Sequence, residues 1–143
     1  MCFPDAKFVL VSRNPYALCY GRTLSDSKDD LKARCNHWFN TFNLAMNDLS
    51  DVDYFFVRFE DFLENPSLEL NSLLSYLELS EQKNLLPSPE QIMPIGGISR
   101  EKWYPLQKDP NAKYLSSLSQ NPDLIQIMTS VLEPLASAFG YRP

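Results

Sequence analysis

Glycine, cysteine and histidine are scarce in this sequence of 143 residues, and each shortage excludes a class of site. Of the four glycines, the one adjacent pair, Gly96-Gly97, lies in a proline-rich stretch rather than after a predicted strand. No glycine-rich turn therefore leads from a strand into a helix, where it would cradle a phosphate. The three cysteines form neither a CxxC pattern nor metal-like spacing with the one histidine, so we predict structural thiols and no metal.

Basic residues and long apolar runs are also in short supply. The chain has 13 Lys and Arg against 18 Asp and Glu, a net charge of −5 at pH 7, and its pI is about 4.8. This balance argues against nucleic acid or an anionic membrane as the main partner, although a local basic pocket remains compatible with it. Neither a secretory signal nor a segment of membrane-spanning length is found, so we predict a soluble cytoplasmic chain.

The composition that is present is that of a packed globule. Hydrophobic residues make up 44% of the chain and aromatic residues 13%, which predicts one domain over residues 1–143 with a real core. The segment from Lys7 to Val11 is apolar and rich in β-branched residues, as is typical of a strand buried on both faces of a parallel sheet. Such a strand needs neighbours, so we expect the domain to be incomplete at its amino terminus.

Polar residues follow this strand directly. Ser12, Arg13 and Asn14 end the apolar run, and Pro15 is suited to the first turn of a helix with Asn14 as its cap. Backbone N–H groups, the helix dipole and an arginine would then face one anion. We interpret the corner as a phosphate site; the alternative is that Arg13 forms a surface salt bridge.

The corner also resembles the 3′-phosphate-binding segment of the sulfotransferase family. Arg13, Asn14, Pro15 and Gly21 occupy the positions of its arginine, [DN]-P pair and closing small residue. The resemblance implies that Arg13 and residue 21 hold the 3′-phosphate of the donor 3′-phosphoadenosine 5′-phosphosulfate, whose product is 3′-phosphoadenosine 5′-phosphate. Gly21 replaces a serine, so one hydroxyl contact is lost, although a glycine N–H can approach a phosphate closely.

The segment from Leu31 to Leu49 is the clearest predicted helix. Ser27 and Asp30 ahead of it have the spacing of a capping box. Apolar residues then recur at intervals of three and four, which predicts a core-facing stripe of Leu31, Cys35, Trp38, Phe42, Ala45 or Met46, and Leu49. His37 flanks this stripe, and we interpret it as a surface or structural residue.

A second apolar run, from Tyr54 to Phe59, predicts a parallel strand joined to the first by a βαβ crossover. Asn65-Pro66 and Asn121-Pro122 each predict a capped helix start, and Gly140 should end the last helix after a kink at Pro134. The predicted class is α/β, a partial P-loop-type three-layer fold with a short parallel sheet flanked by helices.

Two further segments are similar to sulfotransferases. Residues 57–79 resemble the family's strand, ED corner and leucine-rich helix, which implies that Phe59 lies against the donor's adenine; a core position is the competing interpretation. The stretch from 85 to 99 has the prolines and glycines of an extended loop. Arg100 and Lys102, beside Trp103 at its end, are similar to a basic lid over the 3′-phosphate, or form a solvated charge pair beside an anchoring tryptophan.

Three functions remain open at this level. The chain is the carboxy-terminal portion of a sulfotransferase that passes a sulfuryl group to a hydroxyl or amine acceptor, with the catalytic amino-terminal segment absent and the catalytic base unknown. Alternatively, it is a non-catalytic nucleotide-binding or protein-interaction module, or a fragment of another phosphate-binding fold such as a nucleotide kinase. The expected partners are the nucleotide donor, an unknown acceptor, and a complementing amino-terminal segment or a second copy of the chain.

Overall fold

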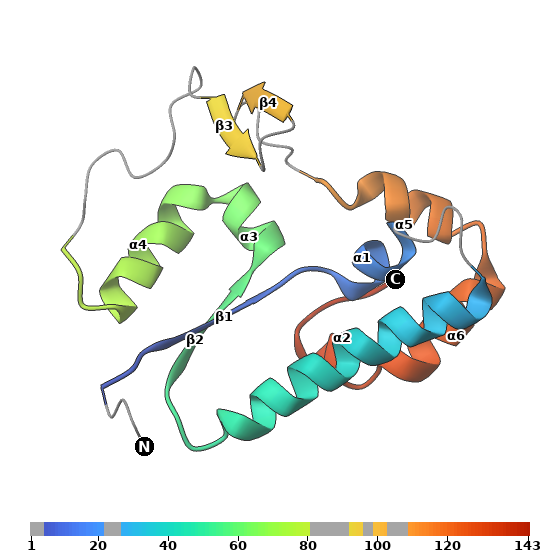
Figure 1. Cartoon of the computed structure of the whole chain (residues 1–143), viewed down its shortest axis with the longest axis horizontal. Coiled ribbons are helices and arrows are strands. Elements are labelled where there is room, and N and C mark those ends of the chain that lie inside the picture. The colour runs from blue at the N-terminus through green and yellow to red at the C-terminus, as the bar shows by residue number, and fades with distance from the viewer. Residues whose placement is uncertain (1–4, 22–26, 81–91, 96–98, 103–108) are drawn as a thin grey trace. The chain divides into compact units, whose positions relative to one another are not determined.

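The computed structural model describes residues 5–21, 27–80, 92–95, 99–102 and 109–143, with the backbone alone for 92–95 and 99–102. Within these ranges the chain forms seven helices and four strands (Figure 1). They belong to two compact units: Met1–Val11 with Phe55–Asp109, and Ser12–Tyr54 with Pro110–Pro143. The single domain expected over residues 1–143 stays a prediction.

The sheet of the first unit consists of the two strands that the sequence indicates. Strand β1 (Phe8–Ser12) pairs in parallel with β2 (Tyr54–Arg58), and the chain between them runs through two helices. Helices α3 (Phe59–Glu64) and α4 (Pro66–Tyr76) follow β2. The predicted α/β class with a short parallel sheet flanked by helices is confirmed, whereas its P-loop-type assignment stays a prediction.

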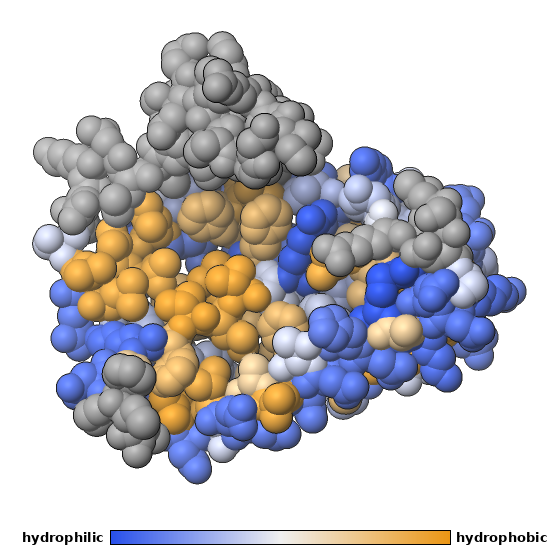
Figure 2. All heavy atoms as spheres, in the orientation of Figure 1, coloured by the Kyte–Doolittle hydropathy of each residue, from blue (hydrophilic) through white to orange (hydrophobic). Residues whose placement is uncertain are grey.

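The prediction that β1 is buried on both faces is wrong. Phe8 is 42% exposed, Val9 40% and Val11 57%, although they belong to the apolar run that predicted an interior strand. An apolar, β-branched run favours extended backbone, but burial also needs covering elements, which local sequence does not supply. Figure 2 shows apolar side chains gathered over α4 and the β1–β2 sheet.

The loop expected from residue 85 to 99 contains regular structure. Strand β3 (Ile92–Ile95) pairs antiparallel with β4 (Ser99–Lys102), in a register that sets Pro94 opposite Arg100 and Ile92 opposite Lys102. The proline and glycine content made a loop the natural expectation, but a proline is compatible with an edge strand. The prediction of an irregular segment is therefore wrong for residues 92–95.

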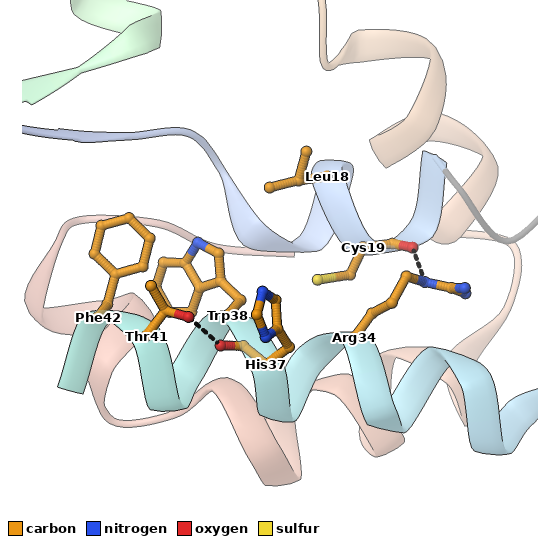
Figure 3. A pocket seen from close by; sticks show the side chains of 7 residues that line it. All are labelled: Leu18, Cys19, Arg34, His37, Trp38, Thr41 and Phe42. Atoms are coloured by element: carbon orange, nitrogen blue, oxygen red, sulfur yellow. Dashed lines mark hydrogen bonds between the residues drawn. The ribbon is translucent and has the colours of Figure 1, made fainter. Parts of the chain in front are cut away.

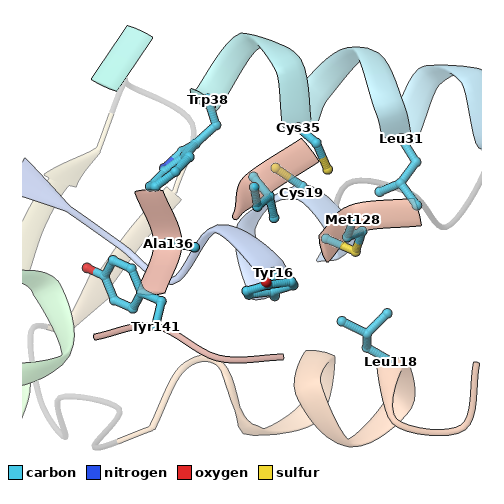
Figure 4. Packing of buried hydrophobic residues seen from close by; sticks show 10 residues of the cluster. Tyr16, Cys19, Leu31, Cys35, Trp38, Leu118, Met128, Ala136 and Tyr141 are labelled. Atoms are coloured by element: carbon cyan, nitrogen blue, oxygen red, sulfur yellow. The ribbon is translucent and has the colours of Figure 1, made fainter. Parts of the chain in front are cut away.

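The second unit is built from helices around one apolar cluster. Helix α2 (Lys28–Asp48) packs against α6 (Pro122–Leu132), and α1 (Pro15–Gly21) packs against both α2 and α5 (Ala112–Leu118). The buried residues of the cluster are Tyr16, Cys19, Leu31, Cys35, Trp38, Leu118, Met128, Leu132, Ala136 and Tyr141 (Figure 4). The predicted core stripe of α2 is confirmed. Among the described residues, no helix combines the length and the apolar character required to cross a bilayer.

Two cysteines lie inside this cluster. Cys19 and Cys35 are both buried free thiols, one on α1 and one on α2 (Figure 4). The neighbouring Cys19 side chain and burial raise the pKa of Cys35 well above its ordinary value. Since the thiolate is the reactive form, both groups have the properties of structural thiols.

The predicted helix starts are only partly correct. Ser27 has extended backbone, with φ −70° and ψ 166°, and it forms the full capping box with Asp30. Asn65 and Asn121 also precede prolines at helix starts, but their ψ angles are 65° and 75°, and neither side chain forms a capping hydrogen bond. Asn121 instead donates its amide to the carbonyl of Ser117. The predicted prolines at these two helix starts are confirmed, whereas the predicted side-chain caps at Asn65 and Asn121 are wrong.

Pro134 and Gly140 mark where the helices near the carboxy terminus are interrupted and end. Helix α6 stops at Leu132, and a separate helix, α7 (Leu135–Ala138), begins after Pro134, so the predicted kink is a full break. Gly140 then adopts φ 76°, a left-handed conformation that favours glycine, and its N–H donates to Ser137. The predicted helix stop at Gly140 is confirmed.

We expect Ser27→Ala to lower the free energy of unfolding by about 1 kcal/mol, because the N-cap hydroxyl accepts a hydrogen bond from the backbone of α2. Urea denaturation measures the change. Ser72→Ala is the matched control, because the Ser72 hydroxyl bonds within α4 to Leu68 and caps nothing. An equal effect of both substitutions would contradict the capping role.

The hydrogen bonds between Ser27 and Asp30 should also make the effect of Ser27→Ala on stability depend on pH. Hydrogen bonds from Ser27 lower the pKa of Asp30 in the folded chain. A lowered folded pKa stabilises the native state above the ordinary aspartate value, and this contribution is lost as the pH falls through the folded pKa. The difference between parent and Ser27→Ala should therefore shrink as the pH is lowered below about 4.

Candidate functional site

The polar corner between β1 and α1 is ordered by Asn14. Its Oδ1 accepts hydrogen bonds from the backbone N–H groups of Tyr16 at 2.9 Å and Ala17 at 3.2 Å. Its carbonyl accepts from Leu18 at 3.0 Å. The predicted cap is confirmed, but these N–H groups now have partners within the chain. The expectation that they would face an anion is therefore wrong, and anion binding by Arg13 stays a prediction.

Arg13 is held in a defined orientation by the start of α5. Its Nε donates to Oδ1 of Asn111 at 2.9 Å, and its Nη2 donates to the carbonyl of Pro110 at 3.4 Å. Asn111 is only 2% exposed, whereas Arg13 is half-buried. A buried amide that accepts from the guanidinium fixes the plane in which its remaining N–H groups lie. The corner thus presents an oriented, partly accessible cation.

The surroundings of Arg13 are polar and closely packed. Ser12 is 2% exposed, and its hydroxyl has no hydrogen-bond partner among the described residues. Asn14 donates its side-chain amide to the carbonyl of Arg142 at 3.1 Å. Tyr16 is fully buried behind the corner and donates to Oε1 of Glu133 at 3.3 Å; burial is the main cause that raises the pKa of Tyr16. These contacts make the corner rigid.

Gly21, the last residue of α1, lies directly against Tyr114 of α5. A Cβ atom at this position would lie 2.9 Å from Cε1 of Tyr114 and 3.1 Å from its Cδ1 and Cζ. A Cβ contact of 2.9 Å is essentially never found in proteins and one of 3.1 Å is unusually short, so the ring or the helix would have to shift. The glycine is explained by the packing of α1 on α5, and a serine would not fit here without rearrangement.

The other predicted site residues belong to the first unit. Phe59 is half-buried and is the first residue of α3 rather than the last of a strand. Arg100 and Lys102 occupy β4, and their side chains lie outside the described residues. Arg13 and Gly21 both border the start of α5. That Phe59, Arg100 and Lys102 join the same site stays a prediction.

The carboxylates after β2 have a structural partner. Asp61 forms an ion pair with Arg58, with 3.7 Å between Oδ2 and Nε. We predicted salt bridging or capping, rather than acid–base chemistry, for the Glu60-Asp61 pair, and for Asp61 this is confirmed. Since both groups are substantially exposed, the pair contributes little stability.

Sequence reasoning placed Ser12 in the corner without giving it a role, and it missed two residues there, Asn111 and Tyr114. Asn111 is 98 positions from Arg13 in the chain. No local pattern pairs two such distant residues. For Ser12 a signal was available, because it is the polar residue that ends the apolar run of β1.

Comparison with known proteins gives the family to which the chain belongs. A model described as "Sulfotransferase family" matches residues 1–83, more than half of the chain. The chain belongs to the sulfotransferase family. The match contains Arg13, Gly21 and Phe59 but ends before Arg100 and Lys102, so the resemblance of the later segments stays a prediction. The search of curated proteins and the search of solved structures gave no match.

We expect Gly21→Ala to destabilise the chain, although the same change inside a helix normally stabilises it by about 0.5–1 kcal/mol. The new Cβ would meet the ring of Tyr114, and overpacking of this kind costs about 1–3 kcal/mol. Tyr114→Ala should remove the clash, so Gly21→Ala should become neutral or stabilising in that background. A double-mutant cycle by urea denaturation measures the coupling; additive effects would contradict the contact.

Proposed function

We propose that the chain binds the donor 3′-phosphoadenosine 5′-phosphosulfate through the corner around Arg13 and acts as part of an enzyme that transfers the sulfuryl group to a hydroxyl or amine. The observation that carries this proposal is the orientation of Arg13. Its guanidinium is fixed by Asn111 and Pro110, and Arg13 lies within the matched residues 1–83, in the segment that resembles the family's phosphate-binding segment. The donor supplies the sulfuryl group, and 3′-phosphoadenosine 5′-phosphate is the product.

The residues of the corner fit a phosphate group. A guanidinium binds phosphate oxygens through charge-assisted, often bidentate hydrogen bonds. The role of Arg13 in this proposal is to hold the donor's 3′-phosphate and thereby to position the nucleotide, not to take part in the bond exchange.

The remaining contacts to the donor are proposed from the family pattern. Phe59 stacks on the adenine, because a purine offers a flat π-face to an aromatic ring. Arg100 and Lys102 occupy alternate positions of β4 and add positive charge toward the 3′-phosphate. The transfer itself requires a 5′-phosphosulfate cradle in a P-loop-like fold and a base for the acceptor, and we assign neither to a residue of this chain.

The exposure of β1 favours a second candidate, a protein-interaction module derived from the same fold. Phe8, Val9 and Val11 are exposed apolar residues on a strand that pairs with β2 alone among the described strands. The strand carries no charged residue between Phe8 and Val11, and uncharged edges readily accept another strand. The occupant we propose is β1 of a second copy, because an isologous contact needs no other partner.

We expect Arg13→Ala to weaken binding of 3′-phosphoadenosine 5′-phosphate by about 1.5–3 kcal/mol, the range for a charge-assisted hydrogen bond. Calorimetry measures the affinity, and 5′-AMP, which lacks the 3′-phosphate, should bind parent and variant equally. Lys32→Ala is the matched control, since it removes one positive charge from an exposed position of α2. Equal affinity of parent and Arg13→Ala for the bisphosphate would overturn the proposal.

The second candidate predicts self-association. Light scattering should find the parent as a dimer or larger species, and Val11→Lys should shift it toward the monomer by placing a charge in the strand contact. Leu44→Lys is the control, because Leu44 is an exposed apolar residue of helix α2 and not of the strand. A monodisperse monomeric parent would contradict this candidate without affecting the nucleotide site.

A further inference from the structure

Two thiols come into contact in the core of the second unit. Cys19 of α1 is 3% exposed, and Cys35 of α2 is fully buried. The two helices pack against one another, and both side chains enter the same apolar cluster (Figure 4). A side-chain hydrogen bond joins the two cysteines, and neither forms a disulfide. The fold therefore holds two reduced sulfur atoms within reach of one another.

The hydrogen bond between the thiols gives them different roles. It is the largest cause that raises the pKa of Cys35, followed by burial and by the charge of an ionised Cys19. A hydrogen bond raises the pKa of an acid when the protonated form donates it, so the Cys35 thiol donates to the sulfur of Cys19. When the pair loses one proton, the negative charge is on Cys19. Cys19 is thus the nucleophile of the pair.

A cavity of about 280 Å³ between α1 and α2 gives small molecules access to this nucleophile. Figure 3 shows the Cys19 sulfur in the space between the two helices, whereas Cys35 does not line the cavity. Hydrogen peroxide is only slightly larger than water, whose share of liquid volume is about 30 Å³, so it fits easily. The residues that line the cavity are Leu18, Cys19, Arg34, His37, Trp38, Thr41 and Phe42.

We propose that Cys19 and Cys35 are an oxidation site at which a small peroxide forms a disulfide between α1 and α2. Each thiol taken singly has the properties of a structural group, and the neighbouring sulfur is what allows oxidation to end in a stable bond. The proposal is independent of the donor site, because neither cysteine belongs to the corner around Arg13.

The reaction proceeds in two steps. The Cys19 thiolate attacks one oxygen of hydrogen peroxide, the O–O bond breaks, and the leaving hydroxide takes up the proton that Cys19 released, which gives a sulfenic acid and water. The Cys35 sulfur then attacks the Cys19 sulfur. The S–S bond forms, the S–O bond breaks, and the leaving hydroxide departs with the Cys35 proton as a second water. Two thiols are oxidised by two electrons, which the peroxide accepts.

The first step also prepares Cys35 for the second. Two of the three causes that hold the proton on Cys35 come from Cys19, namely the hydrogen bond and the charge of the thiolate. A sulfenic acid carries no such charge, so the pKa of Cys35 falls once Cys19 is oxidised. The resolving thiol is therefore unreactive until its partner has reacted.

The test uses the full chain with Cys2→Ser, which leaves this pair as the only thiols. The folded protein is treated with hydrogen peroxide, and remaining thiols are blocked with N-ethylmaleimide. The intact monomer should become lighter by two hydrogen atoms. Trypsin should release peptides 14–22 and 35–58 joined by a disulfide, and dithiothreitol should separate them. Absence of the joined peptides would overturn the proposal.

Single substitutions separate the two roles. In Cys35→Ala, peroxide should add oxygen to Cys19, whereas in Cys19→Ala the buried Cys35 should stay reduced under the same treatment. Oxidation of Cys35 in Cys19→Ala to the extent found for Cys19 in Cys35→Ala would overturn the assigned roles.

A stability measurement tests whether the bond fits the folded core. Circular dichroism should find the oxidised chain folded, with a higher urea midpoint than the reduced chain, because the cross-link restricts the unfolded state. The dithiothreitol-treated sample is the control and should return to the reduced midpoint. Loss of helical signal on oxidation, or a lower midpoint, would overturn the proposal.

Discussion

The hydrogen bond between Arg13 and Asn111 is the contact on which the candidate site depends, because it joins the amino-terminal strand–helix corner to the carboxy-terminal helices. Neighbouring residues make similar connections: Asn14 donates to the carbonyl of Arg142, and Tyr16 donates to Glu133. Each of these bonds spans about a hundred positions or more of the chain. The corner is therefore encoded near one terminus but oriented by the other, and it forms only when α5 and the last turn are in place.

The core of the second unit supports this arrangement. Tyr16 is fully buried in the same apolar cluster that contains Trp38 of α2 and Ala136 of α7, so the first turn of α1 is fixed from the inside. Burial of a large apolar side chain contributes about 1.5–3 kcal/mol, as much as a hydrogen bond from a charged donor. The packing sets where α1 lies, and the hydrogen bonds set the direction of the arginine.

Local features of this fold could be predicted from the sequence, whereas contacts between distant segments could not. The capping box at Ser27, the buried stripe of α2 and the helix stop at Gly140 each depend on residues within a few positions of one another, and all three are found. The prediction that β1 is an interior strand is wrong. Its composition indicates that the segment forms a strand, but it does not indicate whether other elements cover that strand. Strands β3 and β4 were missed because proline and glycine content does not exclude an edge ribbon.

The residues of the candidate site show the same difference between local features and contacts of distant segments. The cap at Asn14 followed from the local order of strand, polar corner and proline, whereas phosphate binding by Arg13 stays a prediction. Asn111 and Tyr114 had no local signal, and both lie outside residues 1–83. The partner of Arg13 and the reason for Gly21 are therefore properties of the tertiary structure, which neither the motif nor the matched segment contains.

Gly21 raises the question of whether an anion site can tolerate the loss of the hydroxyl that the resemblance implies at this position. A neutral hydrogen bond contributes about 0.5–1.5 kcal/mol, whereas a bond from a charged donor contributes about 1.5–3 kcal/mol and a guanidinium can form two. In the proposed donor site, losing the hydroxyl would thus weaken phosphate binding about 10-fold, and Arg13 would supply the larger contribution. The close packing of Tyr114 on Gly21 is therefore compatible with the proposed phosphate site.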